Sequence, residues 1–306
     1  MDWNQIKTEE RNQLSQHIDA MDTVEMLRVI NDEDKKVAFA VEKELSHIAE
    51  AVDLICRQLR QGGRLIYIGC GTSGRLGILD AVECPPTYST DPEQVMGLIA
   101  GGYPAIFKAV EGAEDSRELG RTDLEKVGFS AADVLVGIAA SGRTPYVLGA
   151  MAYAREIGAK TVGVTCCPGS DVEKAADIAI TPVPGPEVVT GSTRMKSGTA
   201  QKMVLNMLST GAMIKLGKVY GNLMVDVKPS NEKLIHRCER IVCEATGISE
   251  EEAVRLLNQC GYSPKVAIVM ALCNVSESEA RALLERNSGR IAGVLGKENC
   301  CGLSSL

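Results

Sequence analysis

The chain has 306 residues, 45% of them hydrophobic, and a formal net charge of −7. A chain of this length and composition can bury a large core, and we expect one large domain with a smaller one beside it. The negative charge provides no basic face for nucleic acid, so the expected partners are small molecules or other protein chains.

Composition also bears on location and on metal binding. Residues 1–20 are polar and charged, unlike a signal peptide, and no apolar stretch is long enough to span a bilayer. The 11 cysteines include the adjacent pairs Cys166–Cys167 and Cys300–Cys301 but no Cys-x-x-Cys. Free thiols in a reducing compartment are therefore expected, rather than disulfides or a zinc site. The three histidines lack ligand-like spacing. We expect a soluble cytoplasmic protein with no membrane contact, no metal and no cofactor.

The first predicted element is one long amphipathic helix over residues 32–61, ended by Gly62 and Gly63. Its apolar residues recur at alternating steps of four and three: Val41, Leu45, Ile48, Val52, Ile55 and Leu59. Together with a Met-rich helix after Gly198, this stripe offers more apolar surface than one sheet face needs. We therefore expect a homodimer with sites near the interface.

A glycine- and hydroxyl-rich loop, GCGTSGR at residues 69–75, follows the first predicted strand and opens a helix that we expect to end at Glu83, before two prolines. Free backbone N–H groups and the helix dipole favour an anion at such a helix start. The glycines also fit the dinucleotide pattern Gly-x-Gly-x-x-Gly, which requires an acidic residue about 20 positions on, at the end of the next strand. That strand ends on Gly101–Gly102 instead, so a phosphate cradle is the preferred interpretation.

Strands rich in Val and Ile alternate with helices through the middle of the chain. We expect strands at 64–68, 95–100, 134–139, 161–165 and 177–181, and helices near 104–110, 115–126 and 145–157. This alternation predicts an α/β fold, a three-layer sandwich in which helices flank a parallel sheet. Ligands bind such sheets at the carboxyl ends of the strands.

Two carboxylates are candidates for acid–base chemistry. Glu83, at its predicted helix C-terminus, would feel the negative end of the dipole, which favours the protonated form of a general acid. Glu114 lies just before the helix expected from Asp115, where the positive end favours a general base. The alternative is that Glu83 is a solvated helix-end residue and Glu114 a capping residue.

A second loop of the same kind, Ser141–Thr144, follows a buried strand and opens a helix at Pro145. Small residues in either loop alone could serve only to permit a tight turn. Two such loops at adjacent strand ends favour convergence on one phosphate. The expected phosphate-binding residues are Gly71, Thr72, Ser73, Gly74, Ser141 and Thr144.

The last part of the chain is helical. A long apolar helix is expected over 198–216, and three short helices over 250–259, 264–272 and 278–286. Acidic first turns after Ser249 and Ser276 are typical of helix starts. We expect an N-terminal helical segment at 1–61, a phosphate-binding α/β domain at 62–240 and a small helical C-terminal subdomain at 241–306.

Long runs of the sequence resemble one family. GCGTSGRLGILDAVECPPTY, AVEGAEDS, AASGRTPYV, VVTGSTRMKSGTAQKMVLNMLSTGAMIKLGKVYGNLMVDV and NEKL, with TEERN near the start, resemble the N-acetylmuramic acid 6-phosphate etherases of the sugar isomerase (SIS) domain superfamily. The resemblance covers nearly the whole chain. It implies cleavage of the lactyl ether of N-acetylmuramic acid 6-phosphate by water, giving N-acetylglucosamine 6-phosphate and D-lactate in cell-wall recycling, and it implies dimerisation.

The family's two catalytic glutamates match Glu83 and Glu114. Val82, where the family commonly has Ser, and Pro229–Ser230 before NEKL depart from the pattern without removing a carboxylate. The resemblance implies elimination, with Glu114 as base and Glu83 as acid, followed by hydration. Arg194 and Lys196 are candidates for the lactyl carboxylate or for ion pairs with surface acidic residues, and the sequence leaves both open.

Two further interpretations remain. A sugar-phosphate sensor like the glucokinase regulatory protein would bind its ligand without turnover, and the complete VECPPT and EGAED motifs oppose it. A phosphosugar isomerase would also remove the C2 proton, so lactate release separates it from an etherase. The fold alone does not distinguish these functions.

Overall fold

The structure, a computed structural model, describes residues 7–227, 229 and 231–296. Two compact units make up the chain: the first runs to Val82 and includes Pro92–Thr210, and the second contains Glu83–Asp91 and the chain from Gly211. Two helices, α3 (Gly71–Tyr88) and α8 (Lys196–Lys215), contain residues of both units. The domain boundary expected after residue 240 falls inside helix α9 (Glu232–Thr246).

The first unit is built on a five-stranded parallel sheet in the order β2-β1-β3-β4-β5. Its strands lie where the sequence predicts them: β1 Leu65–Gly69, β2 Val95–Ile99, β3 Val134–Ile138, β4 Lys160–Val164 and β5 Ile178–Ile180. Every residue of β1 and β3 is buried, as expected of strands covered on both faces.

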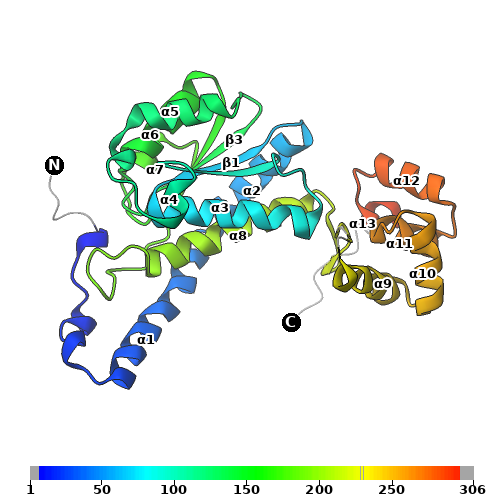
Figure 1. Cartoon of the computed structure of the whole chain (residues 1–306), viewed down its shortest axis with the longest axis horizontal. Helices are drawn as coiled ribbons and strands as arrows, with labels where there is room; N and C mark the ends of the chain where they lie inside the picture. Colours follow the sequence, from blue (N-terminus) through cyan, green and yellow to red (C-terminus); the bar gives the residue numbers. More distant parts are fainter. Residues whose placement is uncertain (1–6, 228, 230, 297–306) are drawn as a thin grey trace. The chain divides into compact units, whose positions relative to one another are not determined.

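Helices cover both faces of this sheet (Figure 1). The helices α5 (Arg117–Lys126), α6 (Pro145–Glu156) and α7 (Asp171–Ala175) lie on one side, and α2 (Leu45–Arg60), α3 and α8 on the other. Successive side chains of a strand alternate between faces. Ile66 and Ile68 thus join the α6 cluster, whereas Tyr67 packs against Gly77 of α3, where an added Cβ would lie 2.8 Å from the Tyr67 Cβ. The α/β three-layer sandwich is confirmed.

The prediction of one long N-terminal helix over 32–61 was wrong in one respect. The region forms two helices, α1 (Thr23–Glu42) and α2. The break lies at Lys43 and Glu44, where the Glu44 carboxylate accepts the backbone N–H of Thr181 at 3.0 Å, just past β5. A contact between residues 137 positions apart leaves no trace in local periodicity, which runs unbroken through the turn.

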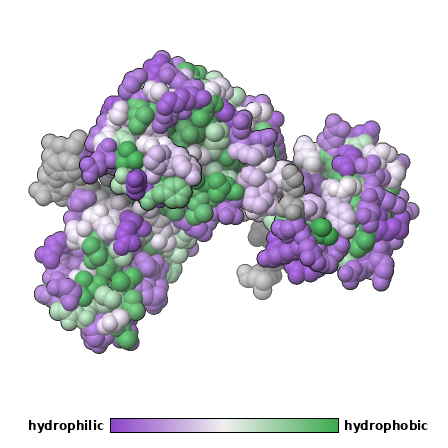
Figure 2. Space-filling model, viewed as in Figure 1, coloured by the Kyte–Doolittle hydropathy of each residue, from purple (hydrophilic) through white to green (hydrophobic). Residues whose placement is uncertain are grey.

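All residues of the predicted apolar stripe except Leu45, which is 48% exposed, are core, so the stripe does not support the dimer as expected. Val41, Ile48, Val52, Ile55 and Leu59 are buried within the chain. Other apolar side chains of α1 are exposed, namely Val24, Leu27 and Phe39. Figure 2 shows apolar surface on this segment.

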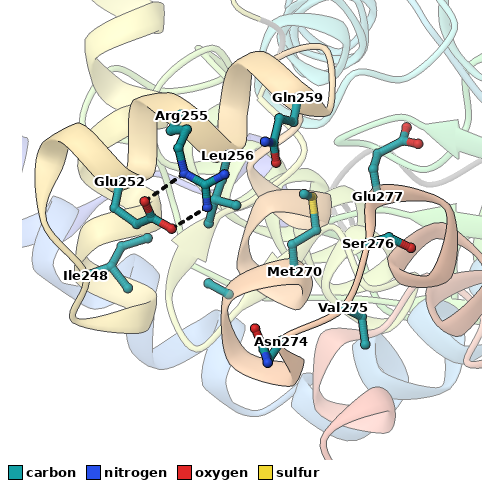
Figure 3. Close-up of a pocket in the computed structure, with 11 residues that line it drawn as sticks. Ile248, Glu252, Arg255, Leu256, Gln259, Met270, Asn274, Val275, Ser276 and Glu277 are labelled. Atoms are coloured by element: carbon teal, nitrogen blue, oxygen red, sulfur yellow. Dashed lines mark hydrogen bonds and ion pairs between the residues drawn. The ribbon is translucent and has the colours of Figure 1, made fainter.

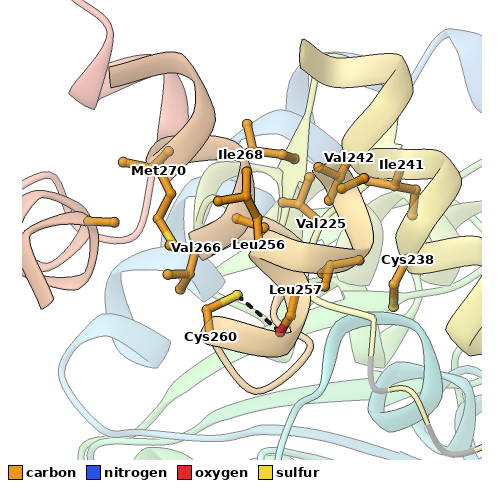
Figure 4. Close-up of a cluster of buried hydrophobic side chains, with 14 of the residues drawn as sticks. Val225, Cys238, Ile241, Val242, Leu256, Leu257, Cys260, Val266, Ile268 and Met270 are labelled. Carbon is orange, nitrogen blue, oxygen red and sulfur yellow. Dashed lines mark hydrogen bonds between the residues drawn. The ribbon is translucent and has the colours of Figure 1, made fainter. Parts of the chain in front are cut away.

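The second unit is mainly helical. It holds a short hairpin of β6 (Val219–Tyr220) and β7 (Leu223–Met224), then α9, α10 (Glu250–Gln259), α11 (Pro264–Cys273), α12 (Glu277–Arg286) and α13 (Ile291–Val294). Its core joins side chains of α9, α10 and α11 (Figure 4). Ser249 and Ser276 cap α10 and α12 as predicted, the latter in a capping box with Glu279.

Shorter elements complete the chain. The 3₁₀ turns Lys7–Glu9, Gln13–Ser15 and Ile18–Ala20 precede α1, and α4 (Pro104–Phe107) follows β2. The cysteines of the described segments are free thiols, whereas Cys300–Cys301 lies outside them. No helix in the described part of the chain is both long enough and apolar enough to cross a membrane.

Candidate active site

The first glycine-rich loop joins β1 to α3 in a tight turn. A Cβ added to Gly74 would lie 2.6 Å from the Gly69 carbonyl oxygen, and one added to Gly69 would lie 2.8 Å from the Gly74 nitrogen. Both glycines are therefore needed for the first turn of α3 to pack on the strand end. The first N–H groups of that helix lack intrahelical acceptors, which suits them to an anion. Gly71, with φ of +52°, begins the helix.

The second loop joins β3 to α6 and has an equally constrained glycine. Gly142 adopts φ of +66°, and a Cβ there would lie 2.2 Å from the Ser170 Oγ. Its carbonyl accepts the N–H of Val172 at 2.9 Å, so the loop is fixed to the start of α7. Pro145 is the first residue of α6, as predicted.

Three of the predicted hydroxyls are available to a ligand. Thr72, Ser141 and Thr144 are half-buried, and within the described ranges no protein group hydrogen-bonds to their hydroxyls. Thr144 occupies the N-cap position of α6 without capping it through its side chain. Hydroxyls that cap helices are used up by the backbone, and these are not.

The strand order brings the two loops to one place. β1 and β3 are neighbours, with Gly69 opposite Ile138. The chain leaves β1 for β2 on one side and returns to β3 on the other, so the carboxyl ends of β1 and β3 flank a topological switch point. The expected adjacency of the loops is confirmed.

Ser73 differs from the other hydroxyls. It is buried, and its Oγ donates to the Gln201 Oε1 of α8 at 2.8 Å. Nearby, a Cβ on Gly198 of α8 would lie 3.3 Å from the Thr72 Cγ2. The first turns of α3 and α8 therefore pack together, and Gln201 belongs to the neighbourhood of the loop. A lone Gln in an apolar helical run gave no sequence signal for this.

Glu114 lies within electrostatic range of the first loop. Burial and the negative charges of Glu114 and Asp115 raise the pKa of the Cys70 thiol to about 12. Cys70 lies between β1 and α3, so the charge of Glu114 acts on the first loop. Glu114 itself is exposed, in a 3₁₀ turn (Ala113–Asp115). The cap of α5 is Ser116, whose Oγ accepts the Leu119 N–H at 3.1 Å, so Glu114 is not the capping residue.

Glu83 does not lie at a helix end, and that prediction was wrong. α3 continues through Pro85 and Pro86 to Tyr88. Each proline removes one backbone hydrogen bond, yet the Ser89 N–H still closes the last turn on the Pro85 carbonyl at 3.0 Å. Glu83 is an exposed residue of the helix interior, in the second unit. Its role as acid remains a prediction, without the dipole argument.

Lys196 is not placed to bind a substrate carboxylate. It is fully buried, and its Nζ lies 2.5 Å from the Glu33 Oε2 and 3.1 Å from the Pro184 carbonyl oxygen. Lys196 therefore has neither of the two expected roles, because its partner is a buried carboxylate rather than a substrate or surface one. Arg194 is exposed, and no ion pair to it occurs in the described part of the chain.

The start of α8 is occupied by a carboxylate that sequence reasoning missed. Glu187, fully buried, accepts the backbone N–H groups of Lys196 and Ser197, each at 2.9 Å, and the Ser197 hydroxyl at 2.9 Å. An anion is favoured at a helix N-terminus, and here the protein supplies its own. The partners are nine and ten positions apart, across irregular chain, so no capping pattern reveals the contact.

A cavity of about 440 Å³ occurs in the second unit (Figure 3). Glu252 and Arg255 of α10 form a bidentate ion pair at its wall, at 2.8 and 2.6 Å. None of the predicted site residues lines it. The predicted phosphate-binding hydroxyls lie instead at the carboxyl ends of β1 and β3.

Comparison with known proteins agrees with this arrangement. The glucokinase regulatory protein N-terminal SIS domain family matches residues 47–155, and the SIS domain family matches residues 128–211. The chain is 61% identical to an N-acetylmuramic acid 6-phosphate etherase of Photobacterium profundum, over 96% of this chain and 98% of that one. It is 60% identical to the enzyme of the same name from Clostridium beijerinckii, over 95% of each. Among solved structures, a phosphoheptose isomerase from Neisseria gonorrhoeae matches with a TM-score of 0.49 and 20% identity, over 61% of this chain and 97% of that one.

Proposed function

Because the chain belongs to the N-acetylmuramic acid 6-phosphate etherase family, we propose that it cleaves the lactyl ether of this phosphosugar to N-acetylglucosamine 6-phosphate and D-lactate. The observation that carries the proposal is identity of about 60% over nearly the full length of both chains. The strand-end loops, with their available hydroxyls, and the charge of Glu114 near Cys70 support it.

The phosphate is assigned to the two loops. Thr72, Ser141 and Thr144 offer hydroxyls, and the backbone at Gly71 offers the start of α3, whereas the expected Gly74 N–H already donates to the Cys70 carbonyl at 3.2 Å. Hydrogen bonds to a charged phosphate are stronger than neutral ones, so the cradle should select phosphorylated sugars. Ser73 joins this set in the way developed below.

The proposed reaction is an elimination followed by hydration. In the open-chain sugar the C1 aldehyde acidifies the C2 proton, and the ether oxygen on C3 is β to that carbonyl. Glu114 removes the C2 proton; the electron pair forms the C2–C3 double bond as the C3–O bond breaks, and Glu83 protonates the departing lactate oxygen. Water then adds to C3 and a proton returns to C2. The enzyme is accordingly a carbon–oxygen lyase.

Release of D-lactate is the test of the function. The purified protein is incubated with N-acetylmuramic acid 6-phosphate and, as a control, with the unphosphorylated sugar. Lactate from the first alone supports the proposal. Binding of the phosphosugar without lactate would indicate a sensor, and an isomerised sugar without lactate would indicate an isomerase.

Labelled water tests the roles of the two glutamates. Elimination and hydration place solvent oxygen on C3 and a solvent proton on C2, whereas displacement at the lactyl carbon would put solvent oxygen in lactate. Glu114→Gln should lose C2 exchange and turnover together. Glu83→Gln should lose turnover but keep some exchange, because proton removal can precede departure of the ether oxygen. Full turnover in Glu114→Gln would remove it as the base.

We also propose a cytoplasmic homodimer. The dimer is supported by exposed apolar side chains of α1, Val24, Leu27 and Phe39, rather than by the buried stripe. The free thiols are typical of a reducing compartment.

A further inference from the structure

A buried polar pair links the first loop to α8. Ser73 is 8% exposed and Gln201 1%, and the Ser73 Oγ lies 2.8 Å from the Gln201 Oε1. The other amide atom, the Gln201 Nε2, is buried with no hydrogen-bond partner in the part of the chain that the structure describes. Buried amide donors without partners are uncommon in native proteins and call for an explanation.

The pair carries three donor protons, and only the one that Ser73 donates has an acceptor in the described part of the chain. A serine hydroxyl carries one proton and an amide nitrogen carries two. With Oε1 towards Ser73, the hydroxyl gives its proton to Gln201, and Nε2 is left unpaired. With the amide turned over, Nε2 donates to the Ser73 Oγ, but the hydroxyl proton then needs another acceptor. A phosphate oxygen beside Ser73 would be that acceptor.

We propose that Gln201 is a positioning residue for the substrate phosphate, acting through Ser73. When the anion binds, the Gln201 amide turns over, Nε2 donates to the Ser73 Oγ, and Ser73 donates its proton to a phosphate oxygen. Hydrogen bonds in such a chain polarise and strengthen one another. The proposal rests on the proposed function, since the anion concerned is the phosphate of that substrate.

The location of the pair supports this role. Ser73 is in the first turn of α3, where the helix dipole favours an anion. Gln201 lies on the second turn of α8, close to where Gly198 packs against Thr72. A Glu at position 201 could only accept from Ser73, so it would hold the hydroxyl proton away from the phosphate and add a negative charge. A Met would fill the space without orienting the hydroxyl.

Binding of N-acetylglucosamine 6-phosphate, measured by calorimetry, tests the proposal without requiring turnover. Gln201→Met should raise the dissociation constant about tenfold, the equivalent of about 1.4 kcal/mol, and Gln201→Glu should raise it further. In turnover, KM for the phosphosugar should rise similarly while kcat stays within about twofold. In a Ser73→Ala background, Gln201→Met should have no further effect, because the residue through which it acts is gone.

Asn206→Leu is the matched control. Asn206 also lies on α8, and its Nδ2 donates to the Asp80 Oδ1 of α3 at 2.8 Å, away from Ser73. It should lower the melting temperature without changing phosphosugar affinity. If Gln201→Met does not fold, the isosteric Gln201→Glu carries the test.

Three results would overturn the proposal: unchanged affinity in the Gln201 variants, equal losses in Asn206→Leu, or an undiminished effect of Gln201→Met in the Ser73→Ala background. If the wild type binds the phosphosugar more tightly than the Gln201 variants do but releases no D-lactate, the proposed function is refuted and this inference stands.

Discussion

Replacing Lys196 by Met should destabilise the first unit and leave substrate binding unchanged. The Lys196 side chain is 1% exposed and the Glu33 side chain 3%, so the ion pair is out of contact with water. Removing one partner of a buried pair typically costs about 3 to 5 kcal/mol, because the other charge remains buried.

Because Glu33 keeps other contacts, we expect the loss in free energy of unfolding to lie near the lower end of this range. Lys36 also pairs with Glu33, and Asn12 hydrogen-bonds to it, so the carboxylate keeps partial compensation without Lys196. We expect Lys196→Met to lower the free energy of unfolding by about 3 kcal/mol. Glu33→Leu should cost more, because only the Pro184 carbonyl would remain for the buried ammonium group. The double variant should lose less than either single one.

The stability that the Glu33 carboxylate contributes should decrease as the pH falls. Burial alone would raise the pKa of Glu33, but hydrogen bonds from Lys196, Lys36 and Asn12 lower it below its ordinary value of 4.5. A carboxyl whose pKa is lowered by folding contributes stability above its unfolded pKa, and this stability is lost as pH falls through the folded value. The difference in free energy of unfolding between wild type and Lys196→Met should therefore be largest at neutral pH and should shrink below about pH 4.5.

Urea unfolding at several pH values, together with KM, provides the assay. Lys36→Met is the matched control: Lys36 pairs with the same carboxylate, but its side chain is 52% exposed, so we expect a loss of at most about 1 kcal/mol. A raised KM with unchanged stability in Lys196→Met would refute the reasoning and return Lys196 to the substrate site.

Three further predictions concern the loops and the assembly. Ser141→Ala should weaken phosphosugar binding by about 1.5 to 3 kcal/mol with little effect on melting temperature, since its hydroxyl is available to the ligand; an unchanged KM would remove it from the cradle. Gly142→Ala should both lower the melting temperature and raise KM, because φ is +66° and the new Cβ would collide with the Ser170 Oγ; a stable variant with normal KM would contradict this. Light scattering should show a dimer that Phe39→Ser weakens, and a monomeric wild type at micromolar concentration would count against it.

The sequence was sufficient for the sheet and for the two loops. Runs of Val and Ile such as Val134–Ile138 predict buried strands because both faces of a parallel sheet are covered. The glycines and hydroxyls at Gly69–Arg75 and Ser141–Thr144 are local features, read from neighbouring residues. Family resemblance added the expected reaction, and sequence comparison confirms the family. The sequence patterns did not predict the amphipathic helix α9 or the short helix α7. Both lie next to irregular chain.

Other features depend on contacts between distant residues, and only the tertiary structure decided them. Local periodicity cannot register that Glu44 binds the Thr181 N–H at the break between α1 and α2, or that the Glu187 carboxylate binds the first N–H groups of α8. Two prolines look like a helix end, yet α3 continues past them. The sequence left the role of Lys196 open, and only the structure shows that its partner is Glu33, 163 positions away. Residue types and their order fix which side chains can carry chemistry, but burial and partners arise only when the chain closes on itself, and these determine whether a charge or a hydroxyl is free to act.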